Sequence, residues 1–262
     1  MSDHLITVSI ARGVARVVLN RRERRNALSL KLLEELQIVL SRLAGDAEAS
    51  VVVIAGAGVA FSAGHDLGEM VERNPGFYED LFTKCTDVML AIQDLPQPVI
   101  AEVDGAAIAA GCQLVAACDL AIASVDSTFA TPGVKIGLFC STPMVPVSRA
   151  VGRKRAMEML LTGEPIDAVT ACDWGLINAA VAREELTASV SDLTDRILRY
   201  SPTVIGMGKA AFYRQVAAAD AEAYDIVQPV MRANAEHPDA QEGIRAFLEK
   251  RSPDWPSQRT RQ

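Results

Sequence analysis

The sequence has 262 residues, half of them hydrophobic, and a formal net charge of −7 at pH 7. This length suffices for one large core, and the acidic balance argues against a nucleic-acid-binding surface. Five cysteines without a CxxC pair fit a reducing compartment, and no stretch reads as a secretion signal or as the ~20 apolar residues of a membrane helix. We therefore expect a cytoplasmic protein that binds neither nucleic acid nor membrane.

The histidines are too scattered to suggest a metal centre. His4, His65 and His237 form no HxH or HExxH motif and no cluster with cysteine. The sequence also contains neither GxGxxG nor GxxxxGK[ST], the loops that cradle dinucleotides and nucleoside triphosphates. We expect no metal and no bound cofactor.

The N-terminal residues predict a hairpin followed by a helix. Residues 5–10 and 14–19 are rich in β-formers and flank a short turn at Arg12 and Gly13. Ser29 is placed to cap a helix whose apolar stripe repeats at helical spacing. The stripe consists of Leu33, Leu36, Leu40 and Leu43.

The next part of the chain alternates between buried strands and helices. Residues 51–55, 99–103 and 120–123 are continuous apolar runs, as expected for strands covered on both faces. Residues 81–92 carry a helical stripe, and the small apolar residues 106–117 predict a closely packed helix. Repetition of strand, glycine-containing loop and helix predicts an α/β core with helices outside.

Downstream of Thr142 the sequence is mainly helical. Residues 186–197 form an amphipathic pattern, and Ser201-Pro202 breaks it. Residues 203–250 then predict two or three helices and no strand. We expect residues 1–200 to form the core and residues 201–262 to form a helical region that docks on the core or on another subunit.

Two stretches carry the strongest chemical signal. AFSAGHDLGEM (60–70) and VDGAAIAAGCQLVAACDLAIA (103–123) each follow a buried strand, contain small residues and open toward a helix, where backbone N–H groups lack partners. Two converging amides can form an oxyanion hole, in which one donor is worth about 3 kcal/mol in the transition state. Spacing alone leaves open the alternative that the small residues only allow close helix–strand packing.

These stretches resemble the enoyl-CoA hydratase/isomerase family, the crotonase superfamily. LNRRERRNALS, FATPGVKIGL and AVGRKRAMEMLLTGEPIDA…WGLIN add to the match, which runs in order over nearly the whole chain. The resemblance implies a spiral of ββα units with a C-terminal helical trimerisation region, and a homotrimer or dimer of trimers. It also implies a lyase of fatty-acid metabolism that binds acyl-CoA thioesters and stabilises an enolate with two backbone amides.

Carried over by position, the family's functional residues fall on defined places in this chain. The oxyanion donors are the amides of His65 and Ala110, although the family usually has glycine at the second position. The resemblance assigns coenzyme A contacts to Arg24, Ala27, Leu28, Ala63, Asp66 and Leu67. An arginine fork suits phosphate oxygens, but the arginine run also reads as a solvated loop, and Asp66 as a helix cap.

The chain departs from the family where a hydratase needs acid–base groups. The two glutamates that activate water correspond to Gln113 and Gly133, neither of which can transfer a proton near neutral pH. No Asp or Glu lies near Cys140 and Ser141 either. Loss of such groups typically costs a factor of about 10² to 10⁴ in rate. The whole chain most resembles the subgroup of enoyl-CoA hydratase domain-containing proteins that lack both glutamates.

Three functional hypotheses follow. The first is an acyl-CoA-binding enzyme of hydratase type with weak or no hydration. The second is decarboxylation, or other enolate chemistry, with help from the His65 ring; the alternative is that His65 acts only through its backbone. The third is a non-catalytic acyl-CoA sensor or scaffold. Cys112 and Cys140 are predicted to be small core residues, with Cys140 as a nucleophile the minor alternative.

Overall fold

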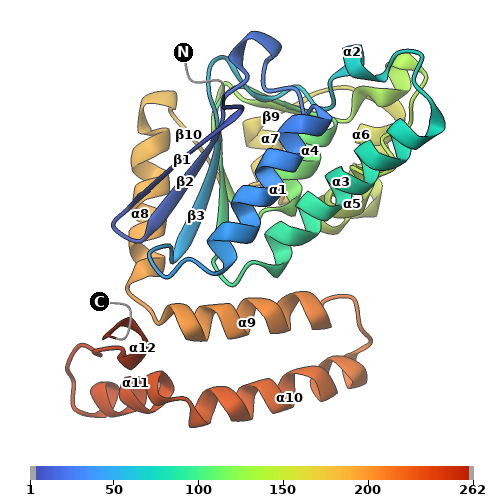
Figure 1. Ribbon diagram of the computed structural model, residues 1–262. Coiled ribbons are helices and arrows are strands. Elements are labelled where there is room, and N and C mark those ends of the chain that lie inside the picture. Colours follow the sequence, from blue (N-terminus) through green and yellow to red (C-terminus); the bar gives the residue numbers. More distant parts are fainter. Residues whose placement is uncertain (1–3, 260–262) are drawn as a thin grey trace.

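The computed structural model describes residues 4–259, whose core contains two sheets covered by helices (Figure 1). The larger sheet has the order β1-β2-β3-β5-β7-β10, and the smaller one β4-β6-β8-β9. The larger sheet consists of β1 (Ile6–Ala11), β2 (Val14–Leu19), β3 (Val51–Gly56), β5 (Val99–Val103), β7 (Leu120–Ser124) and β10 (Ala179–Val181). The smaller sheet consists of β4 (Ala60–Ser62), β6 (Ala106–Ile108), β8 (Thr128–Ala130) and β9 (Ile166–Asp167).

The predicted hairpin is confirmed. β1 and β2 pair antiparallel, with Ala11 opposite Val14. The two residues between them, Arg12 and Gly13, both have positive φ angles, 49° and 80°, as a two-residue hairpin turn requires. From β2 onward the larger sheet is parallel, and the side chains of β3 and β5 are buried on both faces.

Helices cover both faces of the larger sheet. α1 (Leu30–Ala44) and α3 (Pro75–Asp94) lie on one face, and α8 (Leu186–Leu198) lies on the other (Figure 1). As predicted, Ser29 caps α1, since its side chain accepts a hydrogen bond from the Leu32 amide at 3.2 Å. The remaining core helices are α2 (Leu67–Met70), α4 (Ala110–Ala117), α5 (Met144–Val151), α6 (Arg153–Thr162), α7 (Ala168–Trp174) and the 3₁₀ turns η1 (Arg22–Arg24), η2 (Pro132–Ile136) and η3 (Arg183–Glu185).

The chain repeats a ββα unit. Each of the pairs β3–β4, β5–β6 and β7–β8 places one strand in each sheet before the chain enters a helix or 3₁₀ turn. The single helix predicted over residues 106–117 is wrong, because β6 pairs with β8 and only the second part becomes α4. The short strands β9 and β10 were not predicted either, since two or three residues show no periodicity.

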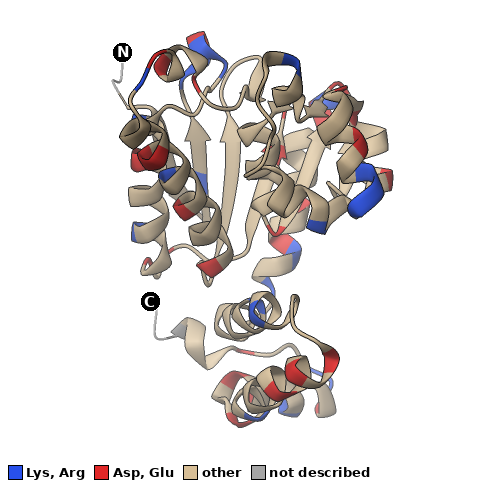
Figure 2. Cartoon of the chain, turned by 90° about the vertical axis from the view of Figure 1, so that its right-hand side faces the viewer, with Lys and Arg blue, Asp and Glu red and all other residues tan. Residues whose placement is uncertain are grey.

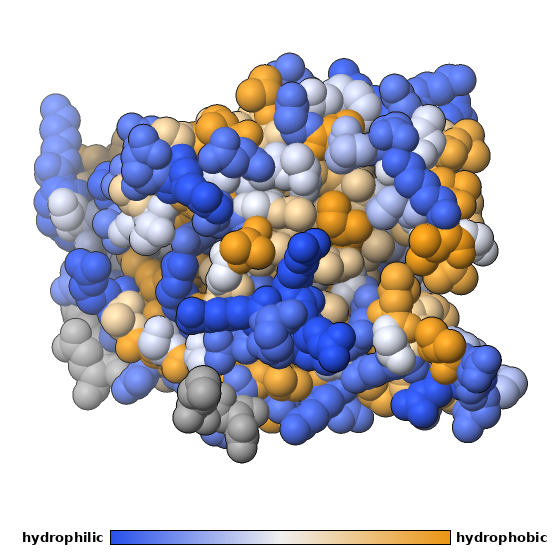
Figure 3. Space-filling model, turned by 90° about the horizontal axis from the view of Figure 1, so that it is seen from above, coloured by the Kyte–Doolittle hydropathy of each residue, from blue (hydrophilic) through white to orange (hydrophobic). Residues whose placement is uncertain are grey.

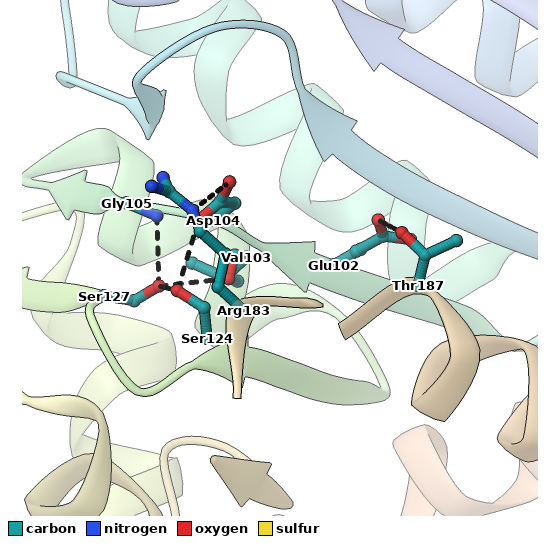
Figure 4. A network of polar contacts seen from close by, with 8 residues as sticks. All are labelled: Glu102, Val103, Asp104, Gly105, Ser124, Ser127, Arg183 and Thr187. Carbon is teal, nitrogen blue, oxygen red and sulfur yellow. Dashed lines mark hydrogen bonds and ion pairs between the residues drawn. The ribbon is translucent and has the colours of Figure 1, made fainter. Parts of the chain in front are cut away.

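Two polar clusters, one around the buried Glu102 and one around the more exposed Asp104, fasten α8 and η3 to the larger sheet. Glu102 on β5 receives both guanidinium nitrogens of Arg16 at 2.6 and 2.7 Å and the hydroxyl of Thr187 at 3.1 Å. Asp104 accepts from Arg183 at 2.9 Å and from Ser124 at 3.2 Å (Figure 4). Because these partners come from several elements, the network fixes their relative positions.

The C-terminal helices form a separate layer beneath the core (Figure 1). They are α9 (Pro202–Gln215), α10 (Asp220–Glu236), α11 (Pro238–Leu248) and α12 (Pro256–Arg259). Lys209 on α9 pairs with Asp119 at 2.7 Å and donates to the carbonyls of Ile92 and Gln97. Tyr213 also donates to Asp119, at 2.8 Å. This cluster anchors the layer to the ends of the core strands.

None of the helices within residues 4–259 combines the length and apolar character needed to span a bilayer. Two cavities, of about 570 and 500 Å³, lie in the C-terminal layer. The first is almost entirely apolar and is bounded by α9, α11 and Trp255. Neither cavity contains the residues that the sequence associates with chemistry.

Candidate active site

Two parallel strands bring the predicted oxyanion donors to one edge of the smaller sheet. β4 and β6 pair side by side, with Ser62 opposite Ala107, so the segments that follow them leave the sheet together. A Cβ added to Gly64 would lie 2.8 Å from the Ile108 carbonyl oxygen and 3.3 Å from the Ala110 amide nitrogen. The backbones before His65 and Ala110 are therefore in direct contact.

Neither of the two amides is engaged. Within residues 4–259, no hydrogen bond joins the His65 or Ala110 N–H to another group. The neighbouring amides differ, because Gly64 donates to Ser62 Oγ and Ala109 donates to the Ala130 carbonyl. Ala110 is the first residue of α4, where the N–H has no intrahelical acceptor. Two adjacent free donors of this kind can stabilise an oxyanion.

Ala109 has an unusual backbone conformation between β6 and α4. Its φ of 50° and ψ of −113° are uncommon for a residue with a side chain. The turn is fixed by the Ala109 bond to Ala130 on one side and by the Gln113 amide, which donates to the Ala109 carbonyl, on the other. Strain of this kind persists only where the surroundings enforce it, often at functional sites.

The His65 ring is turned into the protein. Nδ1 lies 3.4 Å from the Leu28 carbonyl oxygen, and the ring meets the Phe82 ring edge-on at a centroid distance of 5.5 Å. Nε2 is buried without a hydrogen-bond partner. Burial lowers the pKa of His65 and outweighs the hydrogen bond to Leu28, which raises it. The ring is therefore neutral near pH 7. In that form Nδ1–H donates to Leu28, and the ring anchors the residue that carries the free amide.

The residues assigned to coenzyme A differ in what they present to solvent. Arg24 and Leu67 are exposed, and Ala63 is half-buried. Ala27 and Leu28 are buried, so they can reach a ligand only through their backbone. Arginines gather on the loop after β2, at the upper edge of the molecule in Figure 2.

Asp66 is already engaged within the protein. It pairs with Arg21 at 2.7 Å and caps α2 by accepting from the Gly68 amide at 3.0 Å. Burial alone would raise the pKa of Asp66, but the Arg21 hydrogen bond and charge, with help from Gly68 and Arg24, hold it below its ordinary value. Asp66 is thus an ionised structural group, and its predicted contact with coenzyme A remains untested.

The first glutamate position is occupied by a buried glutamine on α4. Gln113 Oε1 lies 4.0 Å from the Cys85 thiol on α3. No hydrogen bond within residues 4–259 uses its Nε2. The side chain offers a neutral amide where the resemblance predicts a hydratase carboxylate, so it can bind an acceptor but cannot remove a proton.

The second glutamate position is closed by its own loop. A Cβ on Gly133 would lie 2.8 Å from the Leu138 carbonyl oxygen and 2.9 Å from Cys140 Sγ. The Gly133 amide donates to that sulfur, yet burial still raises the pKa of Cys140 above its ordinary value. Cys112 is fully buried, and its pKa is raised to about 12. Both thiols therefore stay protonated near neutral pH, as small core residues do.

The carboxylates closest in sequence to the oxyanion loop point elsewhere. Asp66 faces Arg21, and Glu69 accepts from the Leu30 amide at the start of α1 at 3.1 Å. In the described part of the chain, no Asp or Glu hydrogen-bonds to Gln113 or Cys140. The arrangement can polarise a carbonyl group, but these residues provide no carboxylate to carry a proton.

Sequence reasoning missed the contacts that hold this site together. Arg21 and Asn26 were seen only as part of a basic loop, and Ser62 as a small residue. Their partners lie about 30 to 45 positions away in the sequence, as the Arg21–Asp66 and Asn26–Ala60 contacts show. The buried hydroxyl of Thr131, which has no partner, was likewise not singled out. Only the asparagine in RRNALS offered a signal, since asparagine tolerates positive φ.

The two sheets and the repeated ββα units define a fold of the crotonase type. The model of the family described as enoyl-CoA hydratase/isomerase matches residues 9–258, and the chain belongs to this family.

Particular relatives agree. The chain is 46% identical over 244 residues to "Enoyl-CoA hydratase domain-containing protein 3, mitochondrial" of Xenopus laevis, covering 93% of this chain and 83% of that protein. The crystal structure of the human enoyl-CoA hydratase domain-containing protein 3 is similar at 43% identity and a TM-score of 0.94, over 96% of this chain and 100% of that one. An enoyl-CoA hydratase structure from Mycobacterium smegmatis reaches 48% identity and a TM-score of 0.95, over 97% and 99%.

The expected cytoplasmic location is wrong by this comparison. The vertebrate relatives at 44 to 46% identity are named as mitochondrial. The prediction rested on unpaired cysteines and on the lack of a secretion-signal pattern or a membrane-length apolar run. These properties suit any reducing compartment, so they cannot separate the cytoplasm from another one.

Proposed function

We propose that this chain binds acyl-CoA thioesters and stabilises a thioester enolate between the amides of His65 and Ala110. The observation that carries the proposal is the pair of free N–H groups on adjacent backbone segments. Such donors cost no reorganisation when negative charge develops on the thioester oxygen. Coenzyme A itself is part of the substrate, and the proposed chemistry needs no other cofactor.

The coenzyme A moiety fits the surface beside the amides. Arg24 is exposed on the loop after β2, where its guanidinium can meet a phosphate. Apolar side chains are also exposed nearby, on α2 and on the segment that starts with η2, and Figure 3 shows hydrophobic residues scattered among hydrophilic ones on this upper face. These apolar side chains are Leu67, Val71, Val134, Ile136, Leu138 and Phe139. A mixed surface of this kind suits a ligand with a charged and an apolar end.

We propose that hydration by this enzyme is weak. Gln113 and Gly133 replace both proton-transferring groups, and Asp66 and Glu69 are bound to other partners. Enolate chemistry that needs no carboxylate base, such as decarboxylation of a malonyl-type thioester, is favoured by the same observation. The His65 ring is turned into the protein. His65 therefore contributes its backbone amide to such a reaction, and not a free imidazole.

Two measurements test the proposal. A panel of coenzyme A esters should raise the melting temperature, since a ligand at a hundred times its Kd adds about 2.7 kcal/mol of stability. Product analysis with enoyl and malonyl-type esters then identifies the reaction. Turnover of enoyl esters at rates typical of hydratases would refute weak hydration. Binding without turnover of any ester would support a sensor or scaffold, and no stabilisation by any ester would refute acyl-CoA binding altogether.

We also propose that the C-terminal layer joins three subunits. Phe247 and Leu248 at the end of α11 are 82% and 74% exposed, and Ile244 lies one turn before them. They border the apolar cavity that Trp255 helps to line. Large exposed apolar patches mark interaction surfaces, and a second copy of this chain is the partner that the family resemblance predicts.

A further inference from the structure

The segment that carries the His65 amide is held by the loop that follows β2. The Ala63 amide donates to the Arg25 carbonyl at 3.0 Å, and the Leu28 amide donates to the Gly64 carbonyl at 2.7 Å. The Leu28 carbonyl accepts in turn from Asp66 at 3.4 Å. These bonds lie on either side of the His65 N–H and leave it free. They fix the direction of that N–H without occupying it.

Asn26 fixes the shape of this loop from inside the protein. It is fully buried, and its amide donates to the carbonyls of Ala57 and Ala60 at 3.0 and 2.8 Å. Its Oδ1 accepts from the Arg21 amide at 2.9 Å. Arg25 and Asn26 both have positive φ, 50° and 53°, which asparagine tolerates better than most residues. The side-chain bonds offset the cost of this backbone conformation.

Ser62 links the loop to the oxyanion segment. Its hydroxyl donates to the Asn26 carbonyl at 2.9 Å and accepts from the Gly64 amide at 3.3 Å. The Gly64 amide is therefore directed inward. The next amide along the chain, that of His65, then faces away from this contact.

An ion pair closes the far end of the arrangement. Arg21 Nη2 lies 2.7 Å from Asp66 Oδ2, and the two side chains are only 15% and 12% exposed. Arg21 Nη1 also donates to the Ala27 carbonyl at 3.1 Å. A guanidinium engaged on two sides at low exposure is a stronger restraint than an exposed surface pair. Arg21 is thus committed to the protein, whereas Arg24 remains exposed for a ligand.

We infer that Arg21, Asn26 and Asp66 are positioning residues for the oxyanion hole. They act through the backbone of residues 63–66 and keep the His65 amide aligned with the Ala110 amide. This inference rests on the proposed function, because it concerns the same pair of amides. It assigns the loop after β2 a second role, in geometry as well as in ligand contact.

The test measures how strongly the site polarises a bound thioester. The infrared stretch of a ¹³C-labelled thioester carbonyl falls in frequency when both amides donate to it. Asp66→Asn removes the negative charge that holds Arg21 in place. We therefore expect a smaller frequency shift than in the unmodified protein. Turnover should fall by about tenfold or more, because one oxyanion donor contributes 10² to 10³ in kcat.

Two further variants sharpen the result. Arg21→Lys keeps the charge but lacks the fork that contacts Asp66 and the Ala27 carbonyl at the same time, so it should show the same reduced shift. If Asp66→Asn fails to fold, this variant provides the test. Arg22→Gln removes one charge from the exposed part of the same loop and should leave the carbonyl shift unchanged. Thermal unfolding of each variant confirms that the site is compared in folded protein.

The outcomes separate this inference from the function on which it rests. If the unmodified protein binds the thioester without any carbonyl shift, the oxyanion hole is refuted, and the positioning role with it. If the unmodified protein gives the shift and both Asp66→Asn and Arg21→Lys retain it in full, only the positioning role is overturned. An equal loss in Arg22→Gln would also overturn it, since the effect would then be one of loop charge.

Discussion

Gly64 lies against Ala110, so closely that a side chain at residue 64 would reach within 3.3 Å of the Ala110 amide nitrogen. Gly64 also has a φ of 87°, a conformation that side chains disfavour. The two proposed oxyanion donors can therefore be neighbours only while residue 64 has no Cβ. This contact joins the loops after β4 and β6 into one site.

Gly64→Ala should separate the two donors. We expect a loss of stability of about 2 kcal/mol, from the positive φ and the close contact with the Ile108 carbonyl. Turnover should fall further than stability explains, because the amides no longer converge. Gly45→Ala is a matched control, since a Cβ there meets nothing within 4 Å and the φ is negative. Equal activity in both variants, at a temperature where both are folded, would contradict the paired-amide site.

Of the two glutamates that the resemblance assigns to residues 113 and 133, only the first can be introduced without a steric clash. Gln113→Glu places a carboxylate in an existing side-chain position, and we expect enoyl-CoA hydration to rise, by up to about 10²-fold for one added acid–base group. Gly133→Glu differs, because its Cβ would collide with the Leu138 carbonyl and with Cys140. We expect that variant to lose stability and to gain no hydration.

Steady-state hydration assays on the three proteins check this prediction, with thermal unfolding alongside. Gln113→Ala serves as the control, because it removes the amide without adding a carboxylate. Failure of Gln113→Glu to exceed Gln113→Ala would show that residue 113 does not face the reacting carbons.

Much of the framework could be predicted from local patterns. The hairpin at Arg12 and Gly13 and the cap at Ser29 depend on residues near each other in the chain, and both are present. The split between β6 and α4 could not be predicted, because it depends on an alanine at φ 50° that strand pairing enforces. Helix propensity favours alanine throughout residues 106–117, and tertiary pairing overrides it.

In the site, too, the positions of interest could be predicted, whereas the contacts around them could not. Family resemblance identified His65, Ala110, Gln113 and Gly133 as the positions to examine, but gave no geometry. The Arg21–Asp66 pair spans 45 residues, so a run of arginines read in isolation resembles a solvated loop. The contacts that close residues 138–140 over Gly133 span only about five to seven positions, but an irregular loop follows no periodic pattern from which they could be predicted.

The neutral His65 ring predicts how stability depends on pH. Burial lowers the pKa of His65 in the folded state below its unfolded value of 6.5. Between these two values the unfolded state binds more protons, so stability is complete above pH 6.5 and is lost as pH falls through the folded pKa. His65→Asn keeps a donor for the Leu28 carbonyl and does not titrate, so this part of the pH dependence should disappear.

The same variant separates the roles of ring and backbone. Because His65→Asn retains the backbone amide, we expect its turnover at pH 7.5 to remain within about threefold of the unmodified value, far less than the loss of a general base would cause. Urea unfolding between pH 5 and pH 8 gives the stability profile, and turnover is measured on the same samples. A loss of turnover of about 10² or more would assign chemistry to the imidazole.

The exposed end of α11 predicts a change of assembly state. Phe247→Asp places a charge where an apolar contact between subunits is proposed, and burying an unpaired charge is costly. We expect the protein to become monomeric by light scattering while its circular dichroism is unchanged. Ile38→Asp, on the exposed side of α1, is the control and should leave the mass unchanged. An unmodified protein that is already monomeric would refute the proposed trimer.

The cluster around Asp119 predicts how the C-terminal layer detaches. Lys209→Met removes the cation from a pair in which the two side chains are only 7% and 15% exposed, and it leaves the Ile92 and Gln97 carbonyls without their donor. Breaking one side of a buried pair typically costs 3 to 5 kcal/mol, and we expect about 2 to 4 kcal/mol because Tyr213 still bonds Asp119.

The loss should appear first as faster amide hydrogen exchange in α9, with little change in β3 and β5. Lys84→Met is the control: its pair with Asp87 is longer, at 3.9 Å, and more exposed, so it should cost only about 0 to 1 kcal/mol. Uniform acceleration of exchange through core and layer would show instead that the two parts unfold as one unit.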